Sequence, residues 1–465
     1  MIRDQLLAAL HAALDAAGFP TPPGGVELTT PHDPSHGDFT TNVALQLAGP
    51  LGMPPRDVAA KLVVELERAR PPHLERVEVA GPGFLNLRLA PTWLHEVLLA
   101  VVAAGEGYGH GHALDGLRID LEFVSANPTG PLHAGGGRWV AVGDALANLL
   151  ASQGAIVHRE YYLNDAGNQL DTFGASLIAR YRGEAPPEDG YQGQYVVDMA
   201  DRMRAELGDA VTEDQAREWG YRDAVQALQD DLGRLGVHFD TWFSERALHD
   251  EGDVERVLDD LRARGVVFEH DGATWFRSTE FGDARDRVLV RSDGSATYLL
   301  ADVARLTFLL QSVDTAQTFD LDVVTAQSME NPVYYVQYAH ARIASIGRKA
   351  VELGITRRPV LDTSLAPLVH ERELDLLRAL EAYPGVLAEA ATLRAPHRVT
   401  TWVRDFAKAF HGFYRDCRVI SDDVALTQAR LWLAEACRLG LASALAILGV
   451  HAPDEMTRLD DESGP

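Results

Sequence analysis

The stretch that decides the fold is EFVSANPTGPLHAGGGR, residues Glu122 to Arg138. We expect a strand from Ile119 to Val124 to lead into it, and a helix from about Arg138 to Leu150 to follow its three glycines. A second strand is expected from Ile156 to Leu163. The order strand, loop, helix, strand is typical of a βαβ unit, so the sequence predicts a parallel sheet.

Three glycines, Gly135 to Gly137, stand just after His133 and before the expected helix. Glycine lets a backbone approach a ligand closely, and a helix N-terminus favours an anion. The pattern indicates a phosphate-bearing ligand over His133, with Gly135 to Gly137 as a backbone cradle and Arg138 as a further weak phosphate contact. A tight structural turn would explain the glycines nearly as often.

Composition bounds the class of protein. The chain has 465 residues, room for about three domains at roughly 150 residues each, and 46% of them are hydrophobic, which excludes a disordered protein. Cys417 and Cys437 are too few for a disulfide framework. A formal charge of −26 argues against a protein that only grips phosphates, but allows a local basic face. No apolar run approaches the ~20 residues of a membrane span, so we expect a soluble, cytoplasmic protein.

We predict three domains of different type. Residues 1–110 read as an α+β unit with helical stripes and a strand pair that ends at Phe84 to Leu89. Residues 117–318 read as a partial Rossmann-like α/β domain, interrupted by an acidic helical insertion over about 170–285. Residues 319–465 read as a helical bundle. The predicted fold class is therefore multidomain α/β plus α.

The sequence also predicts a linker, two turns and several helix breaks within these domains. The Gly/His-rich segment Gly105 to Gly116 is expected to be a solvated linker, since no further ligands stand at metal-binding spacing from its histidines. Asp271-Gly272 and Asp293-Gly294 predict two hairpin turns. Four prolines are expected to break the helices of the bundle: Pro359, Pro367, Pro384 and Pro396.

One stretch of the bundle is basic although the chain is acidic. Between Ala391 and Ile420, six basic residues stand against two acids, with five aromatic residues interleaved. The aromatic spacing of three to four indicates that most of these rings belong to the core. The basic side chains are the best candidates for contacts with RNA phosphates: Arg398, Arg404, Lys408 and Arg415.

The stretch 122–138 resembles the first signature of arginyl-tRNA synthetases, class I ligases of the HIGH type. The resemblance extends along nearly the whole chain in the right order, which is very specific for common ancestry. It implies ATP-dependent attachment of arginine to tRNA(Arg), a class I catalytic domain at 117–318, and tRNA-binding and anticodon-binding domains at the two ends. The other segments that carry it are His36 to Phe39, Gly81 to Leu89, Arg159 to Gln169 (REYYLNDAGNQ), Asn331 to Arg342 and His397 to Val419.

The resemblance also implies roles for single residues. His133, Gly135 and Gly136 stand at the catalytic positions of the first signature. Glu122 and Asn127, with Ser125 between them, match the positions that hold the α-amino and carboxylate ends of arginine. Tyr298 and Asp302 match the pair that holds the guanidinium group, which an aspartate can bind in a bidentate, charge-assisted pair. A surface Tyr/Asp pair is the alternative interpretation.

Two residues of the N-terminal domain are implied in RNA contact. Phe84 and Asn86 match the aromatic residue and the asparagine that contact a base of the tRNA D-loop, by stacking and hydrogen bonding. A strand alternation that places Phe84 in the core is an equal alternative from the sequence.

The chain departs from the family at the nucleotide site. The second histidine of the first signature is Gly136 here. The second signature, KMSKR, needs two lysines within five residues, and the only lysines are Lys61, Lys349 and Lys408. Arg305 stands alone where that loop would lie. Sheet strands that precede this loop in the family are also missing. A doubly wound sheet binds its nucleotide in the crevice between its two halves, so the adenosine side of that crevice is incomplete here.

These losses predict an altered activity. Each missing donor at a developing anion costs about 10²–10³ in rate. We therefore predict defective arginine activation, with ATP a doubtful cofactor and no tightly bound metal, while an arginine pocket and a tRNA surface persist. The exposed sheet edge could recruit a protein partner or a second copy. Two alternatives stay open: a working arginine–tRNA ligase with unusual ATP-site residues, and an arginine-binding protein without RNA.

Overall fold

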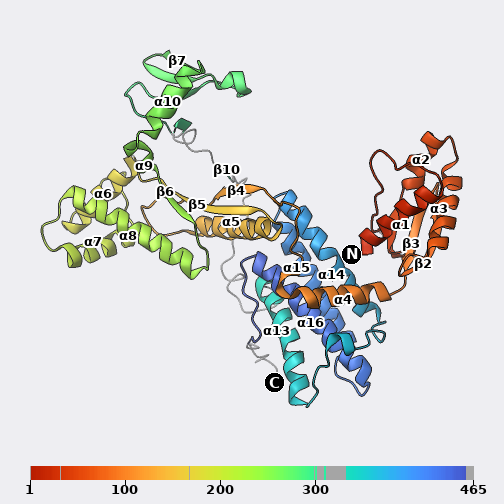
Figure 1. Cartoon of the computed structure of the whole chain (residues 1–465). Helices are drawn as coiled ribbons and strands as arrows, with labels where there is room; N and C mark the ends of the chain where they lie inside the picture. The colour runs from red at the N-terminus through yellow and green to blue at the C-terminus, as the bar shows by residue number, and fades with distance from the viewer. Residues whose placement is uncertain are drawn as a thin grey trace.

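The structure, a computed structural model, describes residues 2–31, 33–166, 168–297, 299–300, 308–309 and 331–456. Figure 1 shows the N-terminal α+β unit on one side, the insertions of the α/β unit on the other, and the helical bundle between them, close to the parallel sheet. The predicted fold class, multidomain α/β plus α, is confirmed. The exact domain boundaries stay a prediction.

The N-terminal unit packs three helices with an antiparallel sheet of order β1-β3-β2. Along β3, Leu85, Leu87 and Leu89 are buried, while Phe84 is 38% exposed. The alternative that places Phe84 in the core is therefore wrong. The elements are α1 (Ile2–Ala16), β1 (Phe39–Thr41), α2 (Val43–Leu51), α3 (Pro55–Ala69), β2 (Leu74–Ala80) and β3 (Phe84–Leu89).

The second unit is built on a parallel sheet of order β10-β4-β5-β6. Its strands are β4 (Arg118–Glu122), β5 (Ile156–Leu163), β6 (Thr241–Ser244) and β10 (Phe308–Leu309), and α5 (Ala134–Ser152) joins β4 to β5. The predicted βαβ unit is confirmed. The predicted helix start near Arg138 is wrong, because the three glycines form the first turn of α5 and not a loop before it.

Two insertions follow β5. The sequence predicted one helical insertion over about 170–285, but β6, a strand of the parallel sheet, divides this stretch in two. The first part is helical and has its own core around Phe173, Met199 and Trp219; a capping box between Thr212 and Gln215 fixes the start of its longest helix. The second carries a small antiparallel sheet of order β7-β8-β9. The elements are α6 (Asn168–Tyr181), α7 (Gln194–Leu207), α8 (Glu213–Arg234), α9 (Glu245–Asp250), α10 (Asp253–Ala263), β7 (Val267–His270), β8 (Ala273–Phe276) and β9 (Arg287–Val290).

The two predicted hairpin turns have different outcomes. Asp271 and Gly272 both have positive φ and connect β7 to β8, so this hairpin is confirmed. Asp293 and Gly294 also form a turn, but a single bridge between Val290 and Ala296 closes it, so no second full hairpin forms.

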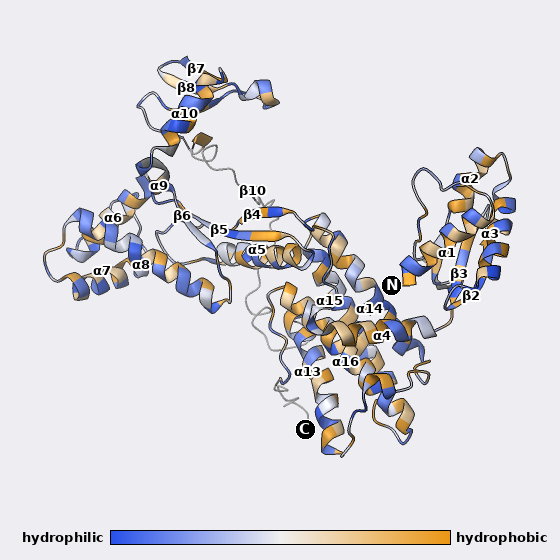
Figure 2. Ribbon diagram, in the orientation of Figure 1, coloured by the Kyte–Doolittle hydropathy of each residue, from blue (hydrophilic) through white to orange (hydrophobic). Residues whose placement is uncertain are grey.

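The bundle packs around α16, which contacts α4, α5 and α13. Figure 2 shows hydrophobic residues along α16. An ion pair of 3.5 Å between Arg3 and Glu381 connects α1 to the bundle. The helices are α4 (Thr92–Ala104), α13 (Pro332–Glu352), α14 (Glu371–Thr392), α15 (His397–Asp416) and α16 (Val424–Ile447).

The expectation of a break at Pro384 is wrong, and the expectation of a solvated linker fails at Tyr108 and Gly109, for one reason. Pro384 lies inside α14 and has no N–H for the carbonyl of Leu380, four residues earlier. The hydroxyl of Tyr108, from the supposed linker, donates to that carbonyl at 2.9 Å. Tyr108 is 4% exposed, and a side chain at Gly109 would meet the ring of Tyr383. Tyr108 and Gly109 are thus packed into the bundle, whereas most other residues of the segment, His110 and His112 among them, are exposed as expected of a solvated linker.

Candidate functional site

The loop after β4 is held in a conformation that ordinary residues avoid. Val124 and Ser125 have φ values of 68° and 42°, which cost of order 1–3 kcal/mol each unless the surroundings fix them. The backbone N–H of Tyr162 donates to Oγ of Ser125 at 3.1 Å, and the hydroxyl of Tyr161 donates to the carbonyl of Ala126 at 2.9 Å. Strand β5 therefore shapes the loop at the carboxyl edge of the sheet, where parallel sheets bind ligands.

His133 is the N-cap of α5. Its Nδ1 accepts hydrogen bonds from the backbone N–H groups of Gly135 at 3.1 Å and Gly136 at 3.3 Å. A nitrogen that accepts carries no proton, so this network assigns the ring proton to Nε2. A phosphate at these glycines would have to replace the two hydrogen bonds to His133, and their role as a phosphate cradle stays a prediction. Arg138 is exposed one turn along α5.

Four of the predicted site residues meet at one cavity of about 530 Å³: Ser125, Asn127, His133 and Gly136. Glu122, at the end of β4, is buried next to the loop. The amide of Asn127 donates to Oε1 of Gln169, which ties the loop to the first turn of α6. Tyr298 and Asp302, the predicted guanidinium ligands, lie outside the described residues, as does Arg305.

The first insertion supplies two tyrosines that sequence reasoning missed. Tyr191 and Tyr195 complete the lining of the 530 Å³ cavity. The hydroxyl of Tyr195 donates to the carbonyl of Thr129 at 2.9 Å, and a Cβ at Gly130 would lie 3.1 Å from the Tyr195 ring. Burial raises the pKa of the Tyr195 hydroxyl, so it stays a donor. The sole sequence signal was a pair of tyrosines in a Pro/Gly loop.

The cavity continues along the edge of the sheet. Tyr191 is shared with a hollow of about 250 Å³, which in turn shares Asn168 and Gln169 with a larger one of about 850 Å³. The larger hollow reaches Thr297 in the second insertion. A substrate longer than an amino acid can therefore lie along this edge, between the two insertions.

The predicted RNA contacts of the N-terminal domain are side by side on β3. Phe84 is exposed and can stack with a base. Asn86 is 8% exposed, and its Oδ1 accepts from the hydroxyl of Thr40 at 2.8 Å, across the β1–β3 pairing. Asn86 is thus fixed by the sheet, and Phe84 is the residue of the two that faces solvent.

The basic residues of α15 are all exposed, and the expectation that most aromatic residues between them are core is confirmed. Arg398 pairs with Glu389 at 3.1 Å and Arg415 with Asp416 at 2.8 Å. In the part of the chain that the structure describes, no carboxylate pairs with Arg404 or Lys408. These two cations are therefore the ones most available to phosphates: one helical turn apart, they share a face of α15.

A second group in the bundle combines a cation with aromatic rings. The guanidinium of Arg342 lies over the rings of Tyr338 at 4.6 Å and Tyr414 at 4.8 Å. It also donates to Nδ1 of His411 at 3.3 Å. Burial, and then the positive charge of Arg342, lower the pKa of His411 to about 4, so the ring is neutral near pH 7. Tyr414 is 43% exposed and Tyr338 is half-buried, so one ring beside the guanidinium is open to stacking with a base, a contact typical of single-stranded RNA sites.

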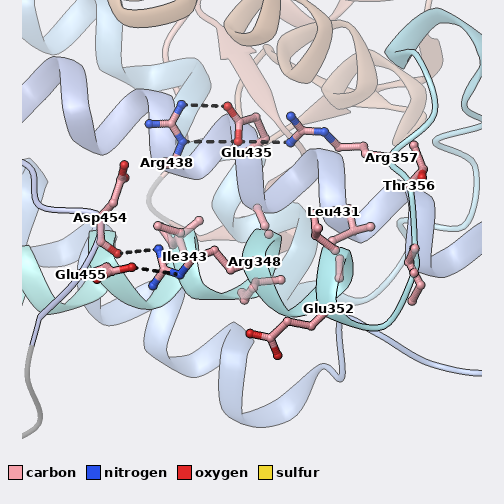
Figure 3. A pocket seen from close by; sticks show the side chains of 18 residues that line it. Ile343, Arg348, Glu352, Thr356, Arg357, Leu431, Glu435, Arg438, Asp454 and Glu455 are labelled. Atoms are coloured by element: carbon pink, nitrogen blue, oxygen red, sulfur yellow. Dashed lines mark hydrogen bonds and ion pairs between the residues drawn. The ribbon is translucent and has the colours of Figure 1, made fainter.

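A cavity of about 1000 Å³ lies between α13 and α16 (Figure 3). Glu435 accepts ion pairs from Arg357 at 3.1 Å and Arg438 at 2.9 Å. Arg348 reaches the C-terminal segment, where its Nη1 donates to the carbonyl of Asp454 at 3.0 Å. Three arginines and four acidic residues (Glu352, Glu435, Asp454 and Glu455) line the opening, and Arg348 also pairs with Glu455 at 3.7 Å. The lining therefore carries no excess of positive charge for a phosphate.

These features define a class of protein. A parallel sheet with its cavity at the carboxyl edge of the first strand, a histidine at the start of the following helix, and a helical bundle beside it form the architecture of a class I aminoacyl-tRNA synthetase. Three family models match the chain: "Arginyl tRNA synthetase N terminal domain" at 2–89, "tRNA synthetases class I (R), catalytic domain" at 212–338, and "DALR anticodon binding domain" at 336–456.

The chain belongs to the arginyl-tRNA synthetase family. The arginine–tRNA ligase of Moorella thermoacetica is 38% identical, over 92% of this chain and 93% of that protein. The arginine–tRNA ligase of Bacillus subtilis is 36% identical, over 98% and 99%. The resemblance inferred from the sequence is thus confirmed.

Solved structures share the fold. The arginyl-tRNA synthetase of Thermus thermophilus has a TM-score of 0.65 at 21% identity, with 98% of this chain and 100% of that chain covered. The enzyme from Plasmodium falciparum has a TM-score of 0.68 at 14% identity, with 98% and 99% covered. Among the described residues, no helix has the length and apolarity needed to cross a membrane.

Proposed function

We propose that this chain binds arginine and tRNA but activates arginine poorly or not at all. One observation carries the proposal. Among the described residues, no lysine or arginine lines the 530 Å³ cavity around His133. Activation requires the carboxylate of arginine to attack the α-phosphate of ATP while pyrophosphate departs with its charge. Such a step depends on cations or donors placed at the departing group.

The residues present do not fit the triphosphate of ATP. The first-turn N–H groups of Gly135 and Gly136 are bonded to His133, and the position of the family's second histidine is Gly136. No two of the three lysines are close enough in sequence to form a KMSKR loop. If the three missing donors acted independently, the loss would be on the order of 10⁶ in rate.

The alignments show that this chain is shorter than two of its relatives, and we propose that the missing residues belong to the nucleotide-binding half. The alignments extend over 524 and 553 residues for the two relatives named above, more than the 465 residues of this chain, so both relatives carry residues opposite gaps in it. The parallel sheet among the described residues has four strands, with the short β10 at the edge next to β4. That edge remains our predicted place for a protein partner or a second copy.

The amino-acid end of the site supports arginine binding. Ser125 and Asn127 line the cavity, and Glu122 is buried at the end of β4, three residues before Ser125. A carboxylate can hold the α-ammonium group of a substrate amino acid, and amide and hydroxyl groups can hold its carboxylate. Tyr298 and Asp302 complete this proposal for the guanidinium group.

Several surfaces support tRNA binding. Phe84 offers a stacking ring in the N-terminal unit, and Arg404 and Lys408 offer cations on α15. The group of Arg342, Tyr338 and Tyr414 lies in the region that matches an anticodon-binding domain. With tRNA as its partner, we propose that the protein acts in the cytoplasm.

A second candidate function is a working arginine–tRNA ligase, favoured by the 36–38% identity to proteins of that name. Arginine-dependent exchange of pyrophosphate into ATP, with and without tRNA(Arg), separates the two. We expect exchange at least about 10³-fold below that of a relative; exchange at an ordinary rate would establish the second candidate.

Binding measurements test the rest of the proposal. Calorimetry should detect arginine with a Kd in the micromolar range, and Asp302→Ala should abolish the heat. Filter binding of tRNA(Arg) over a salt series should show affinity that falls with salt. Absence of tRNA binding, with arginine binding kept, would instead favour the arginine-binding protein without RNA.

A further inference from the structure

One face of the parallel sheet collects metal-ligating side chains that the proposed function does not use. Asp120 on β4 is paired with His158 on β5, and Glu160 follows two residues later on the same face. One potential ligand atom from each of the three lies within 4.8 Å of the other two. Within the described ranges, no other three histidine, cysteine or acidic side chains come this close.

Burial distinguishes this group from an ordinary acidic patch. Glu160 is 6% exposed. Oδ1 of Asp120 is buried and has no hydrogen-bond partner among the described residues. A buried polar atom without a partner costs about 1–3 kcal/mol, and more when the group is charged. A bound cation would remove that cost.

The histidine is both accessible and held in place. The side chain of His158 is 49% exposed, so an ion can reach the group from solvent. Its Nε2 lies 2.9 Å from Oγ1 of Thr241 on β6, and its Nδ1 lies 3.9 Å from a carboxylate oxygen of Asp240. Neighbours of this kind orient a histidine ligand and fix its tautomer.

We propose that Asp120, His158 and Glu160 form a binding site for a divalent transition-metal ion of the Zn²⁺ type. One imidazole nitrogen with two carboxylates suits Zn²⁺, whereas Ca²⁺ and Mg²⁺ prefer oxygen ligands throughout. Three protein ligands leave a further position for water. The site departs from the expectation of no bound metal, which was drawn from spacing along the chain; these ligands come from two strands separated by the whole of α5.

The site does not depend on the proposed function. Its ligands lie on β4 and β5, and none of them is a residue that we assign to arginine, ATP or RNA. Glu122 is paired with Glu160 across the same two strands. The ion would therefore also reduce the negative charge beside the amino-acid end of the cavity.

The test uses the full chain, first stripped of metal with a chelator. Titration with Co²⁺, a coloured substitute for Zn²⁺, should saturate at one equivalent with visible absorption bands, and Zn²⁺ should displace it. Asp120→Asn and His158→Ala should each weaken Zn²⁺ binding, measured by calorimetry, at least about tenfold, since each removes a ligand. Zn²⁺ should raise the melting temperature of the unmodified protein more than that of either variant.

A matched control is present in the same protein. Nδ1 of His112 lies 3.0 Å from Asp115, an exposed His–Asp pair with no third ligand in the described structure. His112→Ala should leave the Co²⁺ bands and the Zn²⁺ affinity unchanged. Circular dichroism shows whether each variant folds. If either the Asp120 or the His158 variant fails to fold, the remaining one of the two tests the proposal. Absence of a one-equivalent site, or equal binding by a folded Asp120 or His158 variant, overturns the proposal.

Discussion

The hydroxyl of Tyr108 donates to the carbonyl oxygen of Leu380 at 2.9 Å, which is the carbonyl that Pro384 leaves without an N–H. The segment after α4 thereby supplies the hydrogen bond that α14 lacks at this carbonyl, more than 270 residues later in the chain. Ser443 of α16 donates in turn to the carbonyl of Tyr108 at 2.8 Å. The junction between the first two units is thus part of the bundle core.

This relationship predicts the effect of Tyr108→Phe. The variant leaves a buried carbonyl unpaired, so we expect the free energy of unfolding to fall by about 1–3 kcal/mol, measured by urea denaturation. The matched control is the same change in a Pro384→Ala background, where residue 384 supplies an N–H. There the loss should be smaller, and an equal loss in both backgrounds would show that the hydrogen bond to Leu380 is not the cause.

Gly136→His tests how much of the catalytic loss comes from the missing histidine. A Cβ at position 136 would lie 3.1 Å from the end of the Leu132 side chain, which can move aside. We expect pyrophosphate exchange to rise by no more than about 10²–10³, the value of one donor, and to stay below that of a relative because two lysines are still absent. Full recovery would mean that the lysines are dispensable here.

Phe84→Ala should weaken tRNA binding without changing its salt dependence. Stacking of one base on an aromatic ring is worth about 1–3 kcal/mol, and no charge is lost. Filter binding at several salt concentrations measures both quantities. Phe84→Tyr keeps a stacking ring and serves as the control; if it weakens binding as much as alanine does, stacking is not the contact.

Arg404→Ala and Lys408→Ala should act in the opposite way. Each removes a phosphate contact, so the slope of log affinity against log salt should decrease by about one. Arg398→Ala is a useful comparison because Arg398 already pairs with Glu389 and should contribute less. An unchanged slope for both Arg404 and Lys408 variants would exclude this face of α15 from the RNA interface.

His411 predicts a pH dependence of stability. Burial and the charge of Arg342 lower its pKa to about 4 in the folded protein, against about 6.5 in the unfolded chain. Between these values the unfolded state binds the proton more tightly, so the stability that His411 confers is complete above about pH 6.5 and is lost as the pH falls toward 4.

Urea denaturation over pH 4 to 7 measures this effect. His411→Gln should reduce the dependence of unfolding free energy on pH by up to one proton, whereas His112→Ala, an exposed histidine, should not. A residual slope is expected from His340, whose pKa burial also lowers. Identical pH profiles for the His411 variant and the parent would contradict the assignment.

Local patterns predicted the elements better than the contacts between them. The strand Ile156–Leu163 and the parallel βαβ order were predicted from hydrophobic runs and glycine, and both are confirmed. Pro384 was expected to end a helix because proline removes a backbone hydrogen bond. The nearby sequence does not show that the hydroxyl of Tyr108 replaces it. The first-turn glycines of α5 were read as a loop because glycine favours loops, and only the cap by His133 reveals the helix start.

The candidate site shows the same division. Ser125, Asn127 and His133 were found because one continuous motif contains them. Three residues were missed because they come from the insertion that follows β5, far from this motif in the sequence. Tyr191 and Tyr195 line the cavity, and Gln169 accepts a hydrogen bond from Asn127. The stacked group around Arg342 was missed because its rings come from two different helices.

The sequence by itself determined the family, the order of the units and the absence of paired lysines, because these properties depend on residue identity and order alone. The tertiary structure decided which side chains share a cavity, which hydrogen bonds replace the one lost at Pro384, and that Asp120, His158 and Glu160 meet on one face of the sheet. Such properties depend on distances across the fold, which pairing and packing set and which separation along the chain does not record.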